Sequence, residues 1–316
     1  SVLIVPEIII GRHRGHSWLT QIGYDWVSPE WPPCHSKPSP PTGLRFSSGS
    51  ITESEWMGVV RDMTLRIRAG QASKVVLARD IEARTDGPID PRWPLRQLLA
   101  SYGSCWNYLI DGLVGSTPEM LVRRERGLTT SRVLAGTVPR VEGVDDAQRA
   151  AQLVSSAKDL EEHRFAVNSV IESLRGHLLA MHVPEAPYVL TLPNVLHLAT
   201  DICGISEPGL STLALADAAH PSAAVCGAPT DVARQLIAHY EQLDRGRFAG
   251  PVGWMDAQGD GEWAVALRCG QIDATDATRM RLYAGGGIMA ASDPHAELVE
   301  TDAKFSPMKA ALRETL

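Results

Sequence analysis

The chain has 316 residues, of which 44% are apolar and 21% are charged. These proportions are typical of a globular protein and exclude a wholly disordered chain or a coiled coil. With 30 basic and 37 acidic residues the net charge is −7, which argues against a general nucleic-acid binder. A chain of this length can bury a large core without disulfides or a structural metal.

Lysine is rare in this sequence. Of the 30 basic residues, 25 are arginines and only 5 are lysines: Lys37, Lys74, Lys158, Lys304 and Lys309. Coding bias explains such a ratio. A sharper hypothesis is that lysine stands where arginine cannot serve, because a desolvated lysine can act as a base and arginine cannot release its proton.

The cysteine pattern and the hydropathy predict a cytoplasmic protein without membrane segments. The five cysteines are widely spaced, contain no CxxC pair and indicate buried thiols in a reducing compartment. No apolar run reaches the roughly 18–20 residues that a membrane helix needs. Residues 2–10 are apolar but are interrupted by Pro6 and Glu7, so a signal peptide is not expected.

The first half of the chain predicts one helix, a strand, a second helix and then several short strands. Residues 1–50 are expected to form a strand and a Pro-rich loop that belong to the same domain as residues 51–316. Apolar spacing and the capping signal at Thr52 and Glu55 predict the first helix. The predicted helices are 51–70 and 94–102, and the predicted strands are 74–83, 106–110, 112–115, 119–123 and 128–134.

The second half predicts a long helix over residues 145–182, then strands and helices, and a last helix over residues 294–314. The other helices are expected at 210–219 and 230–242, and the strands at 188–192, 195–200, 252–256, 262–272 and 279–284. Strands come in runs instead of alternating strictly with helices. This order favours an α+β fold with antiparallel sheets.

Two predicted helices carry acidic residues three positions apart, Asp159 with Glu162 and Glu297 with Glu300. Residues at this spacing share one helix face. If the helices faced one another, four carboxylates would converge, and oxygen-only ligation favours Mg²⁺. The alternative is that both pairs lie on solvated helix faces.

Three further features are weak when taken singly. The run Gly285-Gly286-Gly287 predicts a tight turn whose backbone could approach an anion, but it fits neither a P-loop nor a dinucleotide fingerprint. Lys74 opens a predicted strand and is either a solvated charge or a base with a buried stem. Glu119 follows a proline and is either a turn residue or a buried acid.

Together these segments resemble the chorismate-utilising enzymes: isochorismate synthases, salicylate synthases, and component I of anthranilate and aminodeoxychorismate synthases. The similar segments run in family order from about residue 50 to the C-terminus. They include Lys74-Val-Val-Leu-Ala-Arg79, Gly115-Ser-Thr-Pro-Glu119, Lys158-Asp-Leu-Glu-Glu-His163, His220-Pro-Ser-Ala-Ala-Val-Cys-Gly227, Arg247-Phe-Ala-Gly-Pro-Val-Gly253 and Glu297-Leu-Val-Glu-Thr-Asp-Ala-Lys304.

The resemblance implies the anthranilate synthase component I fold, an α+β sandwich of two large antiparallel sheets flanked by helices. It also implies Mg²⁺ on the ring carboxylate of chorismate. Glu162 and Glu300 would be the metal ligands, with Glu297 and Asp159 close by through water. Asp159 stands where several relatives have the longer glutamate.

The same resemblance implies a reaction in which Lys74 takes a proton from water that attacks C2 of the ring. Glu119 would then protonate the C4 hydroxyl as it leaves, which gives isochorismate for siderophore or menaquinone synthesis. The implied substrate-binding residues are Gly136, Thr137, His197, Ala224, Phe248, Arg268, Gly285, Gly287 and Lys304. The partner is chorismate alone, with no nucleic acid or membrane, and the protein is expected to be a monomer.

Salicylate synthase, which goes on to eliminate pyruvate, is the alternative enzyme. Phe248 stands where salicylate synthases tend to have tyrosine, and Ala224 stands where relatives with other outcomes often have threonine. Both positions favour stopping at isochorismate. A non-catalytic chorismate-binding protein and a purely structural α+β domain are the alternatives from other classes.

Overall fold

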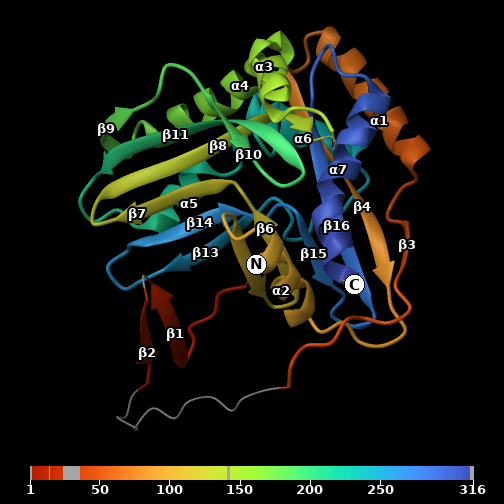
Figure 1. Cartoon of the computed structure of the whole chain (residues 1–316). Coiled ribbons are helices and arrows are strands. Elements are labelled where there is room, and N and C mark those ends of the chain that lie inside the picture. Colours follow the sequence, from red (N-terminus) through yellow and green to blue (C-terminus); the bar gives the residue numbers. More distant parts are fainter. Residues whose placement is uncertain (1, 14, 24–35, 141–142, 314–316) are drawn as a thin grey trace. The chain divides into compact units, whose positions relative to one another are not determined.

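The computed structural model describes residues 2–13, 15–23, 36–140 and 143–313. The chain divides into two compact units, Ser1–Pro38 and Ser39–Leu316. The first contains one antiparallel hairpin, β1 (Ile8–His13) and β2 (His16–Gln21) (Figure 1). The division therefore falls at Pro38 and not at residue 50, and a common domain for the two units stays a prediction.

The second unit contains two seven-stranded antiparallel sheets, which confirms the predicted α+β fold (Figure 1). The first sheet has the order β12-β4-β16-β15-β6-β5, and β3 also pairs with β4. Its strands are β3 (Arg45–Ser48), β4 (Lys74–Arg84), β5 (Trp106–Ile110), β6 (Leu113–Thr117), β12 (Gly227–Ala228), β15 (Cys269–Ile272) and β16 (Arg279–Ile288).

The second sheet has the order β10-β11-β8-β7-β14-β13, and β9 also pairs with β11. Its strands are β7 (Met120–Glu125), β8 (Leu128–Pro139), β9 (Leu178–His182), β10 (Tyr188–Thr191), β11 (Val195–Ser206), β13 (Pro251–Met255) and β14 (Gly261–Val265). The longest ladder joins β8 to β11 along most of their lengths.

The helices are α1 (Glu53–Arg68), α2 (Arg92–Ser101), α3 (Asp146–Ser155), α4 (Ala157–Leu174), α5 (Thr212–Ala219), α6 (Thr230–Tyr240) and α7 (Pro294–Leu312). The capping box at Thr52 and Glu55 begins α1 as the sequence predicts. No helix in the described part of the chain is long and apolar enough to span a bilayer.

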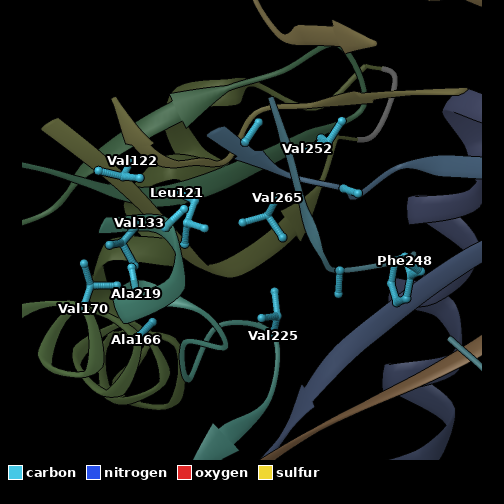
Figure 2. Packing of buried hydrophobic residues seen from close by; sticks show 14 of the residues in the cluster. Leu121, Val122, Val133, Ala166, Val170, Ala219, Val225, Phe248, Val252 and Val265 are labelled. Carbon is cyan, nitrogen blue, oxygen red and sulfur yellow. The ribbon is translucent and has the colours of Figure 1, made fainter. Parts of the chain in front are cut away.

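The main apolar core joins the two sheets. Figure 2 shows Val122 and Val265 of the second sheet packed with Val170 of α4 and Ala219 of α5. The same cluster includes Tyr108 and Cys269 of the first sheet. This packing fixes the two sheets and α4 relative to one another, and the candidate site lies where they meet.

The predicted helix over residues 145–182 is wrong in two respects. Ser156 has an extended backbone that ends α3, and its hydroxyl accepts a hydrogen bond from the Asp159 amide and so caps α4. The segment Leu178–His182 is not helical but forms β9 on the edge of β11. The apolar stripe is continuous through both changes, and it therefore conceals them.

Two strand boundaries also differ from the prediction. The expected strand 262–272 is broken between β14 and β15, where Arg268 has a φ of 49°. The expected glycine turn at 285–287 is instead the end of β16, where Gly285 pairs with Ala78 and Gly287 with Val76. Both departures lie at the candidate site.

Candidate active site

A cavity of about 700 Å³, its open mouth included, lies where β4, β8, β11, β16, α4 and α7 approach one another. It gathers most of the predicted site residues. Those that line it are Glu119, Gly136, Thr137, Glu162, His197, Ala224, Phe248, Arg268, Gly285, Gly287 and Lys304. Lys74, Asp159, Glu297 and Glu300 are not among its lining residues.

Glu119 is the acidic residue with the clearest chemical signature. It directly precedes β7 and is only 6% exposed. Burial raises the pKa of its carboxyl from 4.5 to about 7, against the opposing charges of Lys74, Arg268 and Lys304. A carboxyl with this pKa holds its proton near neutral pH and can donate it into the cavity.

Lys74 is fully buried at the start of β4. Its Nζ lies 3.1 Å from Oε1 of Glu162, which lines the cavity, but the approach does not make a hydrogen bond. Burial acts to raise the pKa of Glu162, yet the charges of Lys74 and Lys304 hold it below its ordinary value. Glu162 is therefore a carboxylate at neutral pH.

The glycines of β16 make room for this pair. A Cβ on Gly287 would overlap the Glu162 carboxylate and approach Cε of Lys74 to 2.7 Å. A Cβ on Gly286 would lie 3.2 Å from Oε2 of Glu297 and 3.9 Å from Oε1 of Glu300. The bare strand thus lets carboxylates from α4 and α7 approach the same stretch of backbone.

Lysines hold the two carboxylates of α7. The Lys304 amine lies 2.6 Å from Oε1 of Glu300 and donates to the Gly285 carbonyl at 2.8 Å. The Lys158 amine donates to Oε1 of Glu297 at 2.9 Å. Burial and the charge of Glu300 nevertheless raise the pKa of Glu297 above its ordinary value.

The predicted metal ligands are neighbours but are not preformed as a metal cluster. Among the described residues, no three Asp, Glu, His or Cys side chains form such a group, and lysines pair with three of the carboxylates. Asp159 is half-buried and packs against Gly136, and burial raises the pKa of its carboxyl. The donor set, carboxylates only, is compatible with Mg²⁺.

His197, Thr137 and Arg268 form a polar chain across the cavity. Arg268 donates to Nε2 of His197 at 3.1 Å, and Nδ1 of His197 lies 2.9 Å from the Thr137 hydroxyl. Burial and the charges of Arg268 and Lys304 hold the pKa of His197 well below its ordinary value. His197 is therefore neutral with its proton on Nδ1, which leaves the Thr137 hydroxyl proton available to a ligand.

The sequence did not single out two residues that also line the cavity, Arg245 and Tyr283. The Tyr283 ring stacks on Phe248 with centroids 5.3 Å apart and an angle of 10°. Arg245 stands two residues before Arg247-Phe-Ala-Gly and four residues after Glu241, and this acid–base spacing was an available signal.

The pattern of chorismate-binding enzymes matches residues 33–313 of the sequence. The chain belongs to the chorismate-binding enzyme family. Isochorismate synthase DhbC of Bacillus subtilis is 38% identical over 324 residues, which cover 98% of this chain and 77% of DhbC. The chain therefore spans about three quarters of that relative.

Solved structures of family members share the fold. DhbC from Bacillus anthracis matches with a TM-score of 0.80 and 35% identity, over 94% of this chain and 78% of that one. MenF, the menaquinone-specific isochorismate synthase from Escherichia coli, matches with a TM-score of 0.77 and 30% identity, over 88% of this chain and 65% of that one. Isochorismate synthases named as specific for 2,3-dihydroxybenzoate and for menaquinone thus share this fold.

Proposed function

We propose that the protein is an isochorismate synthase, which adds water at C2 of chorismate and releases the C4 hydroxyl. The observation that carries this proposal is a fully buried lysine whose charge acts on Glu119, a glutamic acid of pKa about 7 that lines the cavity. A base and a neutral-pH acid are the two groups that this hydroxyl migration requires. The similarity to enzymes named isochorismate synthases supports the same reaction.

Glu119 serves as the acid in this proposal. Its carboxyl is protonated in a large part of the molecules at neutral pH, and it lines the cavity. It gives its proton to the departing C4 hydroxyl and is left as a carboxylate. The nearby charges of Lys74, Arg268 and Lys304 stabilise that carboxylate.

Lys74 serves as the base. Its Nζ reaches the cavity wall beside Glu162 and Gly287, and it has no hydrogen-bond partner among the described residues. It accepts the proton of the attacking water in its neutral form.

Mg²⁺ is the cofactor in this proposal, held by Glu162 and Glu300 with Glu297 and Asp159 close by. A bound Mg²⁺ offsets the charge of the ring carboxylate and orients the ring. Lys158 and Lys304 pair with Glu297 and Glu300 and offset part of the charge of this acidic set.

The remaining cavity residues bind and orient the substrate. Arg268 offers its guanidinium to the enolpyruvyl carboxylate, and the Thr137 hydroxyl, aligned by His197, reaches the ring hydroxyls. The backbone of Gly136, Gly285 and Gly287 supplies amides, Lys304 adds positive charge, and Ala224 and Phe248 close the apolar side.

Product analysis tests the proposal. Purified protein with chorismate and Mg²⁺ should yield isochorismate, with no salicylate or pyruvate. Lys74→Met should abolish turnover. The control Lys309→Met alters a lysine that lies over the Phe46 and Phe305 rings and should keep activity. Salicylate as product would replace the proposal by salicylate synthase, and full activity of Lys74→Met would refute the assigned base.

Metal binding is tested separately by calorimetry. The double variant Glu162→Gln/Glu300→Gln should weaken Mg²⁺ binding by more than about tenfold. Glu161→Gln changes an exposed neighbour on α4 and should bind Mg²⁺ as the unaltered protein does. Equal Mg²⁺ affinity in all three proteins would refute the proposed ligands.

We further propose a monomer in the cytoplasm. The four cysteines of the described residues, Cys105, Cys203, Cys226 and Cys269, are free thiols, as expected in a reducing compartment. Light scattering of the purified protein measures the oligomeric state, and a dimer mass would refute the monomer.

A further inference from the structure

One edge of β4 lacks a neighbouring strand after Val75. On that edge β12 pairs with Lys74 and Val75, and β3 pairs only from Ile81 onward. The residues between them still face inward, so their backbone groups need partners. Among the described residues, three side chains and one backbone carbonyl make the hydrogen bonds that a neighbouring strand would otherwise make.

The replacement contacts are specific. The Val76 amide donates to the Cys226 carbonyl at 2.8 Å, and the Val76 carbonyl accepts from Arg245 at 2.8 Å. The Ala78 amide donates to Oε2 of Glu241 at 2.7 Å, and the Ala78 carbonyl accepts from the Trp56 indole at 3.0 Å.

Glu241 and Arg245 form a buried two-pronged ion pair. Nε and a terminal nitrogen of Arg245 donate to the two oxygens of Glu241, each at 2.6 Å. The other terminal nitrogen donates to the Val225 carbonyl at 3.0 Å. The Glu241 side chain is 2% exposed and that of Arg245 19%. Such a fork fixes direction as well as distance.

This pair ties together three walls of the cavity. Val76 lies two residues from Lys74, Val225 follows Ala224, and Arg245 begins the segment that carries Phe248. Each wall contributes a residue of the proposed mechanism or of the product preference. A small shift of any wall would misplace the base relative to the ring.

We propose that the Glu241–Arg245 pair is a positioning element that holds the strand of Lys74 and the loop of Ala224 against the substrate. The inference rests on the proposed function. It assigns the pair a role in turnover that exceeds its contribution to folding, although neither side chain donates or accepts a proton in the reaction.

The test compares Arg245→Met and Glu241→Leu with the control Arg279→Met. Arg279 pairs with Glu82 in the same sheet but outside the cavity. Both pair variants should lower kcat for chorismate by about 10- to 100-fold with little change in KM, at a temperature where they are fully folded. Glu241→Gln still accepts a hydrogen bond from the Ala78 amide, so its kcat should fall less than that of Glu241→Leu.

Arg279→Met should lower Tm and keep kcat. An Arg245→Met protein that melts earlier but retains kcat would overturn the inference, because the pair would then be only structural. Amide hydrogen exchange separates this result from failure of the proposed function. If the unaltered protein does not convert chorismate, the proposed function fails by itself, and the exchange result decides the inference.

In the amide hydrogen-exchange measurement, the Val76 and Ala78 amides of Arg245→Met should lose more protection against exchange than the global fall in stability accounts for. They should stay protected in Arg279→Met. Unchanged protection of these amides in Arg245→Met would overturn the positioning role whatever the substrate.

Discussion

Replacing Glu119 by glutamine should remove a pH dependence of stability that the buried carboxyl imposes. Burial raises the pKa of Glu119 to about 7 in the folded chain, against 4.5 as its ordinary value. The folded state therefore binds one more proton than the unfolded state between these pH values, and its stability falls as pH rises through them. The difference corresponds to about 3 kcal/mol.

The assay is urea denaturation of the unaltered protein and of Glu119→Gln from pH 4.5 to pH 8. The two should have similar stability at the low end, and Glu119→Gln should be more stable by about 3 kcal/mol at the high end. Glu125→Gln, at an exposed carboxylate at the end of β7, the strand that Glu119 precedes, should follow the unaltered protein. If the free energies of unfolding of Glu119→Gln and the unaltered protein changed with pH in parallel, the raised pKa of Glu119 would be refuted.

Three further outcomes follow from the same geometry. Gly287→Ala should lower the free energy of unfolding by about 1–3 kcal/mol, because its methyl group would overlap the carboxylate of Glu162. The control Gly58→Ala lies in open space on α1 and should raise that free energy by up to about 1 kcal/mol. Lys158→Met should lower the free energy of unfolding by about 1–3 kcal/mol, because it leaves the buried Glu297 without its cation. The double variant with Glu297→Gln should regain part of this loss. If the effects of the two substitutions were simply additive, the expectation would be contradicted. Arg268→Lys should raise KM for chorismate more than it lowers kcat in steady-state assays, since lysine lacks the two-pronged contact, and an unchanged KM would contradict that role.

The sequence predicted the fold class, most elements and most cavity residues, because those rest on periodicity, capping and the ordered family segments. It failed where local pattern and tertiary packing disagree. The apolar stripe of 145–182 does not reveal that Ser156 ends one helix and caps the next. Glycines at 285–287 suggest a turn, but pairing with β4 keeps them extended.

The site was harder to predict because side-chain pairing decides it. Spacing places Glu162, Glu297 and Glu300 on helix faces, yet it cannot show that each meets a lysine. Arg245 was missed because two of its partners, the carbonyls of Val76 and Val225, are backbone groups far away in the sequence, and only Glu241 stands near it. No residue pattern marks a contact with a distant backbone carbonyl.

The placement of the lysines has a practical consequence for chemical labelling. Lys74 is fully buried, the Lys304 amine is held by Glu300 and its side chain is 12% exposed, and Lys158 pairs with Glu297 but is 34% exposed. Of the five side-chain amines only Lys37 and Lys309 lie outside this group. Amine-reactive crosslinkers and surface immobilisation would thus attach the folded protein at very few points. Reagent uptake at Lys74 would report directly on opening of the cavity.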